Sequence, residues 1–182
     1  RNESSAASDV YKRQAIGLAA SVRVGNLVGA NASQDSRFAA FCGIGFSIAL
    51  AISNAAILIL YGEYLASFFN PNSLIISLAS TLLIVAAIFQ ITDGIAFSGM
   101  GALRGYKDTR VPLLIMIIAY WVVGMPLGYN ISLTDNIIEP IGALGMWIGM
   151  AAGMFILSIL VLWRLNLVSK NSAQFQQSYE NN

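Results

Sequence analysis

Long apolar runs dominate the chain, and charged residues occur mainly between them. Four stretches contain no charged residue other than one aspartate: residues 38–62, 64–103, 111–134 and 140–163. A helix that crosses the hydrocarbon core of a membrane needs about 20 mostly apolar residues, and each stretch is longer than that. Buried strands, in contrast, rarely exceed about eight residues. The pattern therefore predicts four transmembrane helices, at about residues 38–62, 73–103, 111–133 and 141–164.

A fifth, shorter helix is expected at about residues 15–33, where small apolar residues surround Arg23. Residues 15–22 would extend only about 12 Å as a helix, which is too short to cross the membrane. The basic residues Lys12 and Arg13 lie just before them. We therefore expect residues 1–14 to be a non-native leader, and the native part of the chain to open in the middle of a helix. The alternative is a short amphipathic helix on the membrane surface.

The charged residues between the apolar runs predict the orientation of the chain. The segments that connect the apolar runs alternate in charge: those with basic residues alternate with those whose only charged residues are acidic. The basic set is Arg37, Arg104, Lys107, Arg110, Arg164 and Lys170, and the acidic set is Glu63, Asp135 and Glu139. Because short loops rich in Lys and Arg stay in the cytoplasm, we expect a cytoplasmic C-terminus. Residues 169–182, rich in Ser, Gln and Asn, are expected to form a disordered tail there, after one unit at residues 15–168.

Composition excludes most other classes of protein. Only 10% of the residues are charged and 57% are hydrophobic, whereas soluble domains have about 25% charged residues. Ten Lys and Arg residues against nine Asp and Glu residues give a net charge of +1, which offers no electrostatic attraction for nucleic acid. The chain has no histidine and one cysteine, Cys42, so His-based triads and Cys/His metal sites are excluded. We expect neither an enzyme nor a structural metal site.

Asp93 is the strongest candidate for a functional residue. A carboxylate within the membrane is costly, and such residues usually face a protein interior or an aqueous cavity and mark an ion path. On a helix, Phe89, Gln90 and Phe97 lie one turn away from it, and Thr92 is a further possible supporting residue. Burial disfavours the charged carboxylate and a bound cation favours it, which allows a proton or a sodium ion to be exchanged for another cation. The alternative is a carboxylate that only joins helices by hydrogen bonds.

Two further groups have both a functional and a structural interpretation. A possible substrate cavity for organic cations consists of Phe97, Tyr120, Trp121 and Met125, because aromatic rings and thioethers attract such cations, although helix packing explains these residues equally well. A possible cytoplasmic hinge consists of Arg23, Arg104, Lys107, Asp108 and Arg110, although the same charges can serve topology alone. Arg23 is expected to reach the membrane surface or to pair with Asp35 or Asp108.

Small residues predict how the helices approach one another. Glycines recur at four-residue spacing, in the sets Gly25 and Gly29, Gly101 and Gly105, Gly124 and Gly128, and Gly145, Gly149 and Gly153. This spacing allows helix backbones to pack closely in lipid. Pro126 lies within the third apolar run, and it predicts a kink there because proline cannot donate a backbone hydrogen bond.

Five segments in this order resemble the multidrug and toxic compound extrusion (MATE) family: AIGLAASVRVGNLVGA, FQITDG, GALRGYKDTRVP, YWVVGMPLGY and IGALGMWIGMAAG. The similarity extends over residues 15–167 and corresponds to the end of helix eight and helices nine to twelve of a twelve-helix transporter. It implies an all-α integral membrane protein, here a partial C-terminal lobe with four complete transmembrane helices and part of a fifth. The lipid bilayer and the N-terminal lobe of the same protein are then its partners.

The resemblance also implies a function. Members export organic cations or drugs by antiport with sodium ions or protons, and they need no other cofactor. For this chain we expect a place in the bacterial inner membrane. Asp93 falls on the carboxylate of the C-lobe cation site, whose glutamate partner belongs to helix seven, and Phe89 falls where some sodium-coupled members have tyrosine. Two alternatives remain: an oligomeric ion channel, and a lipid-linked oligosaccharide flippase of related architecture.

Overall fold

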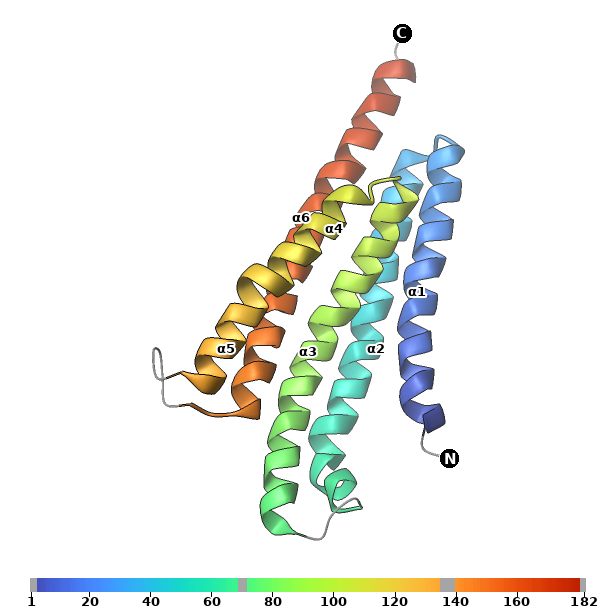
Figure 1. The fold of residues 1–182 in the computed structure, drawn as a ribbon. Helices are drawn as coiled ribbons and strands as arrows, with labels where there is room; N and C mark the ends of the chain where they lie inside the picture. Colours follow the sequence, from blue (N-terminus) through green and yellow to red (C-terminus); the bar gives the residue numbers. More distant parts are fainter. Residues whose placement is uncertain (1–2, 69–71, 135–139, 181–182) are drawn as a thin grey trace. The chain divides into compact units, whose positions relative to one another are not determined.

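The computed structural model describes the backbone of residues 3–68, 72–134 and 140–180, and the side chains of residues 15–68, 72–134 and 140–173. Within these ranges the chain is helical and contains no strand (Figure 1). The helices are α1 (Glu3–Gly29), α2 (Ser33–Ser67), α3 (Ser73–Gly105), α4 (Arg110–Ile117), the π-helix η1 (Ile118–Gly124), α5 (Met125–Leu133) and α6 (Ala143–Glu180). The expected all-α class is confirmed.

Four helical segments among the described residues are long and apolar enough to cross a membrane. They are Ser33–Ser67, Ser73–Gly105, Arg110–Leu133 and Ala143–Ala173, and they confirm the four predicted transmembrane helices. Many of their large apolar side chains are exposed, among them Leu60 and Leu74, as expected for helices that lipid surrounds. The apolar part of α1, Ala15–Gly29, is shorter than these four segments.

The C-terminal end of α6 differs from the expectation. The sequence predicts a disordered tail from residue 169, and this prediction is wrong at its beginning, because α6 continues past residue 168. Ser169 is fully buried, and its hydroxyl donates to the carbonyl oxygen of Asn166 at 3.2 Å. Residues 169–180 include neither glycine nor proline, and Lys, Gln and Ala are good helix formers. A polar composition therefore did not end the helix.

The described residues form two compact units. Among these residues, the first unit comprises 3–48, 94–115 and 158–180, and the second comprises 49–68, 72–93, 116–134 and 140–157. Each unit contains parts of α2, α3 and α6, whereas α1 belongs to the first unit and η1 and α5 belong to the second.

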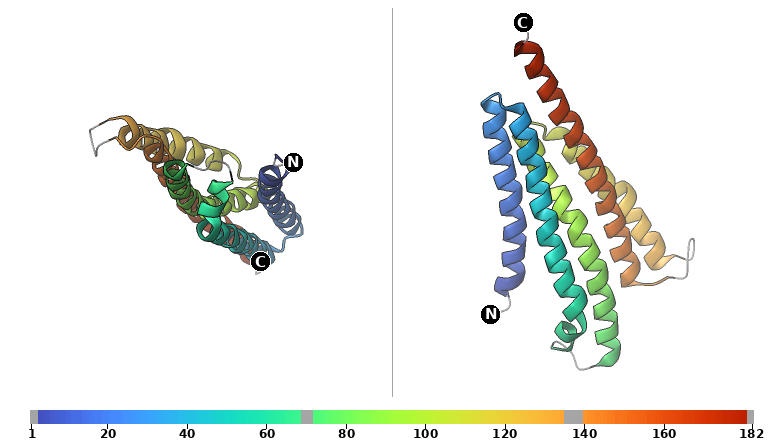
Figure 2. Two further views of the ribbon diagram at one scale, coloured as in Figure 1. Left: turned by 90° about the horizontal axis from the view of Figure 1, so that it is seen from below. Right: turned by 180° about the vertical axis from the view of Figure 1, so that it is seen from behind.

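Close backbone contacts between glycines occur in both units. In the first unit, a Cβ atom added to Gly105 would lie 2.9 Å from the backbone nitrogen of Gly25. In the second unit, a Cβ atom added to Gly149 would overlap the backbone of Gly128, where α5 lies beside the beginning of α6 (Figure 2). These contacts agree with the close packing that the four-residue spacing predicts.

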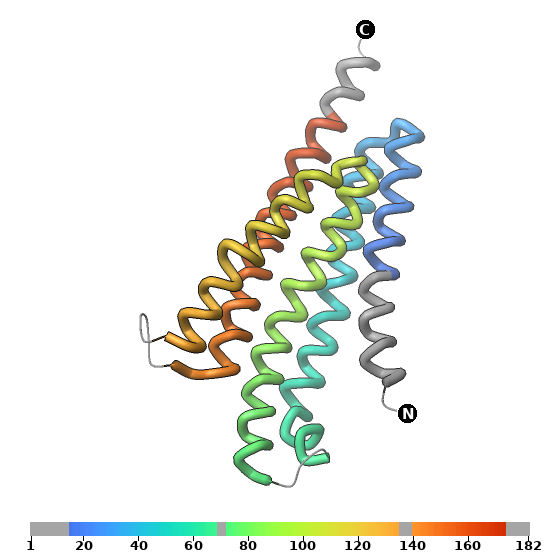
Figure 3. The backbone as a smooth tube through the Cα atoms, viewed as in Figure 1, coloured from blue at the N-terminus to red at the C-terminus, as the bar shows by residue number. Residues whose placement is uncertain are grey.

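Pro126 lies at the start of α5, directly after the π-helical segment. The N–H of Met125 donates to the carbonyl oxygen of Tyr120, five residues earlier, and the backbone runs from η1 into α5 without interruption (Figure 3). Proline has no N–H to donate, and its ring collides with the carbonyl group one α-helical turn before it. A wider turn relieves such a collision, so the disturbance expected at Pro126 takes the form of a π-helical segment.

Candidate functional site

Asp93 is buried in the second unit although it lies within a membrane-length helix. At 1.5 Å per residue it is about 30 Å from the start of α3 and about 18 Å from its end. Its exposed fraction is 7%, and that of the neighbouring Thr92 is 8%. The carboxylate therefore faces protein rather than lipid, as expected for an intramembrane charge.

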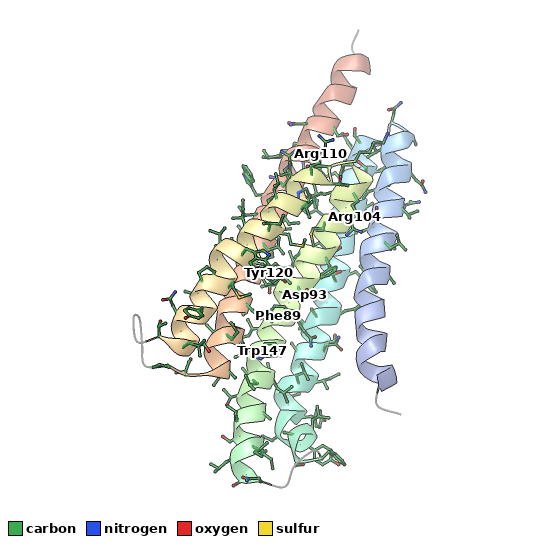
Figure 4. The ribbon with its side chains drawn as sticks, in the orientation of Figure 1. Phe89, Asp93, Arg104, Arg110, Tyr120 and Trp147 are labelled. Carbon is green, nitrogen blue, oxygen red and sulfur yellow. The ribbon has the colours of Figure 1, made fainter. Side chains whose placement is uncertain are left out.

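Aromatic side chains from three helices gather in the same part of the second unit as Asp93 (Figure 4). Tyr120, on η1, interacts electrostatically with the Asp93 carboxylate, and its hydroxyl donates to the sulfur of Met154 on α6 at 3.6 Å. The Phe89 ring, one turn before Asp93 on α3, meets the Trp147 ring of α6 edge-on with 6.5 Å between centroids. These contacts join α3, η1 and α6 around the carboxylate.

An apolar groove lies between α3 and α6 within this unit. It has a volume of about 340 Å³, and its lining includes Phe89, Thr92, Ala152 and Phe155. Thr92 supplies the only hydroxyl in the lining, and this hydroxyl donates to the carbonyl oxygen of Phe89 at 2.9 Å. The walls are otherwise hydrocarbon and aromatic, so the groove suits an apolar or flat guest more than a strongly hydrated one.

The other residues of the expected site are less concentrated. Tyr120 and Gln90 are half-buried, whereas Trp121 is 68% exposed and Met125 is 46% exposed. Phe97 is 36% exposed and belongs to the first unit. None of these five lines the groove, and their role in a substrate cavity stays a prediction. Trp147, an aromatic residue that the sequence also offers for such a cavity, reaches the site from α6. Met154 reaches it from the same helix, and its separation of more than 50 residues from Asp93 gives no indication of this contact.

The hinge residues of the first unit form a different set of contacts from the expected one. Asp108 pairs with Arg164 of α6, with 2.7 Å between Oδ2 and Nε, and its side chain is only 14% exposed. The expected pairing of Arg23 with Asp35 or Asp108 is not found, and no ion pair of Arg23 occurs among the described residues. Arg104, Lys107 and Arg110 are exposed. Their proposed role in gating stays a prediction.

Backbone geometry at the end of α3 positions this carboxylate. Lys107 has a left-handed conformation with φ of 61°, and its N–H donates to the carbonyl oxygen of Arg104 at 2.9 Å. The N–H of Asp108 donates to the carbonyl oxygen of Leu103, also at 2.9 Å. These two bonds constitute a Schellman motif, which ends the helix and turns Asp108 toward α6.

Two further polar contacts connect the same end of the first unit. The Tyr106 hydroxyl lies 2.9 Å from the Ser36 hydroxyl at the start of α2, and Arg37 donates to Asn166 of α6 at 3.1 Å. Burial raises the pKa of the Tyr106 hydroxyl above its ordinary value of 10.0, against smaller lowering effects of the Ser36 hydrogen bond and the Arg37 charge. The partners are 70 and 129 residues apart in the chain, and no local pattern in the sequence identifies them.

Known proteins resemble the chain over most of its length. Multidrug resistance protein PmpM of Pseudomonas aeruginosa is 36% identical over 165 residues, which cover 91% of this chain and 34% of that protein. Multidrug resistance protein NorM of Vibrio vulnificus is 39% identical over 165 residues, with coverage of 91% and 36%. The chain thus spans about a third of the length of the curated relatives it matches.

A solved structure has the same fold. The crystal structure of the eukaryotic MATE transporter AtDTX14 superposes with a TM-score of 0.78 at 19% identity and covers 91% of this chain and 37% of that protein. The family model named MatE matches residues 13–130. This match includes α2, α3 and the buried Asp93. The chain belongs to the MatE family, the multidrug and toxic compound extrusion family that its five segments resemble.

Proposed function

We propose that this chain forms the C-terminal part of a transporter that exports drugs or organic cations in exchange for sodium ions or protons. Asp93 holds the coupling ion. The observation that carries this proposal is a carboxylate, 7% exposed, in the interior of a 33-residue apolar helix. The names of the relatives PmpM and NorM, both multidrug resistance proteins, support drugs as the exported class.

A buried carboxylate suits coupling because its charge is expensive without a partner. A proton or a sodium ion neutralises the charge, and release of that ion restores the cost. The transporter therefore favours one conformation when an ion is bound at Asp93 and another when no ion is bound. One positive charge that crosses 100 mV is worth about 2.3 kcal/mol, which corresponds to about a fiftyfold concentration ratio. A single coupling carboxylate thus suffices for useful export.

The groove that Phe89 and Thr92 line, close to Asp93 along α3, supports an organic substrate. Its hydrocarbon walls and the Phe89 ring offer contacts to flat apolar groups, and a cationic group gains from nearby aromatic faces. Tyr120 and the edge-on Trp147 ring add aromatic surface close to the carboxylate. Neutralisation of Asp93 by the coupling ion removes the negative charge that attracts an organic cation, so the two cations compete.

The proposal also has the C-terminus in the cytoplasm and the protein in the bacterial inner membrane. The exposed side chains of Arg104, Lys107 and Arg110 support this orientation, because basic loops are retained on the cytoplasmic side. The remaining two thirds of the transporter supply the rest of the central cavity.

Ethidium efflux tests the proposal. The complete transporter that contains this chain is expressed in drug-sensitive bacteria, as wild type, as Asp93→Asn and as the matched control Glu63→Gln, an exposed carboxylate near the end of α2. We expect efflux by wild type and Glu63→Gln and at least tenfold slower efflux by Asp93→Asn, at equal amounts in the membrane. Removal of the sodium gradient and of the proton gradient in turn identifies the coupling ion.

Three outcomes contradict the proposal in different ways. Undiminished efflux by Asp93→Asn would show that this carboxylate only joins helices. Absence of efflux by all three variants would instead favour an oligosaccharide flippase, and a current through the membrane without coupled export would favour a channel.

A further inference from the structure

A second groove lies in the first unit, away from every residue used in the proposed transport. Gln34, Arg37, Phe38 and Phe41 of α2 line it together with Ala173 of α6, and its volume is about 470 Å³. The four α2 residues follow the spacing i, i+3, i+4 and i+7, which places them on one face of the helix. Arg37 directly precedes the charge-free run 38–62 of α2, and Ala173 lies beyond the charge-free run of α6, which ends at residue 163. The groove therefore lies at a boundary between membrane and water.

The Arg37 guanidinium is held in place at this groove. Its Nη2 donates to the Asn166 side chain at 3.1 Å, and its central carbon lies 5.8 Å from the centroid of the Phe41 ring. The Arg37 guanidinium has five N–H groups, and the hydrogen bond to Asn166 uses one of them. The fixed orientation reduces the entropy that a ligand loses when it binds, and the remaining N–H groups match the oxygens of a phosphate.

A second positive charge lies beside the groove. Lys170 follows Asn166 by one turn and precedes Ala173 by one turn, so the three share a face of α6. Its side chain is exposed. The nearest acidic residue along α2 is Asp35, two positions from Arg37, and residues at this spacing do not share a helix face. The polar end of the groove is therefore positively charged.

The other end of the groove is aromatic and points along α2 into the apolar run. Phe38 is 73% exposed and Phe41 is 37% exposed. Both belong to the stretch that begins directly after Arg37 and contains no charge up to residue 62. A ligand that fits this groove has a negative headgroup and an apolar body. This combination describes a phospholipid rather than a free phosphate ion.

We propose that the α2–α6 groove is a binding site for an anionic phospholipid, with its phosphate on Arg37 and Lys170 and an acyl chain against Phe38 and Phe41. The site takes one lipid in preference to the bulk bilayer. Lys and Arg residues next to a membrane attract anionic lipids in general. The aromatic lining and the anchored guanidinium give this groove a preference for a single bound anionic phospholipid.

Native mass spectrometry of the full chain in detergent tests the proposal. Phosphatidylglycerol is titrated against phosphatidylcholine as the neutral lipid and glycerol 3-phosphate as a headgroup without acyl chains. We expect one tightly bound phosphatidylglycerol per chain, about tenfold weaker binding to Arg37→Gln and about threefold weaker binding to Lys170→Gln. The matched control Arg104→Gln removes an exposed charge outside the groove and should stay within twofold of wild type.

Further measurements separate the site from general charge and from misfolding. Arg37→Lys keeps the positive charge but lacks the planar guanidinium, so it should bind more weakly than wild type and more tightly than Arg37→Gln. Helix content by circular dichroism confirms that each variant is folded. Equal weakening by Arg37→Gln and Arg104→Gln overturns the proposal, because the attraction is then one of surface charge. Equal affinity for phosphatidylcholine, or for glycerol 3-phosphate, overturns it as well.

Discussion

Replacement of Gly149 by alanine should destabilise the second unit, because the helix backbones meet there without space for a side chain. A Cβ atom on Gly149 would overlap the backbone nitrogen and Cα of Gly128, and it would lie 2.8 Å from the carbonyl oxygen of Gly124. Ordinary Cβ contacts begin at 3.4 Å. The backbones must therefore separate by at least about 0.6 Å at Gly124, and by more at Gly128, at the cost of packing contacts.

The magnitude follows from two opposing effects. Overpacking of a filled interior costs about 1–3 kcal/mol, and the upper end applies to Gly149 because backbone atoms cannot rotate away as a flexible side chain can. Alanine has a higher helix propensity than glycine by about 1 kcal/mol. We expect a net loss of about 2 kcal/mol in the free energy of unfolding for Gly149→Ala.

Gly45→Ala is the matched control for this substitution. Gly45 also lies in a transmembrane helix, but a Cβ atom added to it meets nothing within 4 Å. Its replacement should leave stability unchanged or raise it by up to about 1 kcal/mol. The difference between the two variants therefore isolates the contact between α5 and α6.

Reversible unfolding of the purified chain in mixed micelles, followed by circular dichroism during an SDS titration, gives the two free energies. If Gly149→Ala is as stable as Gly45→Ala, the backbones do not meet at Gly149, and close glycine packing is refuted as the basis of this helix pair.

Two predictions concern the polar end of the first unit. Asp108→Asn and Arg164→Gln should each lower the free energy of unfolding by about 1–2 kcal/mol. This range lies between the contribution of an exposed ion pair and that of a charge-assisted hydrogen bond. A coupling energy of zero in a double-mutant cycle would show that the two side chains do not interact. Because burial raises the pKa of Tyr106 above 10.0, the folded state keeps its proton at a pH where the unfolded state has lost it, so this group's contribution to stability is present below pH 10 and declines above it. The free energy of unfolding of Tyr106→Phe should therefore fall less than that of wild type between pH 9 and pH 11. If the two proteins lose stability equally over this range, titration of Tyr106 does not contribute to the pH dependence.

The transmembrane helices could be predicted because lipid imposes a simple condition on sequence. A spanning segment must be apolar over its whole length and must satisfy its own backbone hydrogen bonds, and both conditions are visible as charge-free runs. The burial of Asp93 follows from the same condition, because one charge within such a run has to face protein. The prediction of a disordered tail from residue 169 failed, because a polar composition alone does not determine where a helix ends.

The partners of individual residues could not be predicted, because sequence spacing does not identify which helices meet. The repeat of Gly145, Gly149 and Gly153 indicates a close contact, but any of several helices could supply the opposite face. Similarly, Asp108 had several basic residues available, and Arg164 is its partner because the Schellman motif at Lys107 turns it toward α6. No glycine marks this left-handed position in the sequence.

The distribution of contacts makes a test of function at Asp93 interpretable. Lipid provides no hydrophobic drive for helix association, so close backbone packing and polar pairs determine which helices meet. In the second unit, the contact of Gly149 with Gly128 does not involve the carboxylate, and asparagine has nearly the same shape as aspartate. Asp93→Asn should therefore keep the stability of wild type while it slows export at least tenfold, whereas Gly149→Ala should lose stability with Asp93 unchanged. A variant that exports less but is as stable as wild type has lost a functional group rather than a packing contact. Comparison of these two substitutions therefore separates the role of the Asp93 carboxylate in export from the role of helix packing in stability.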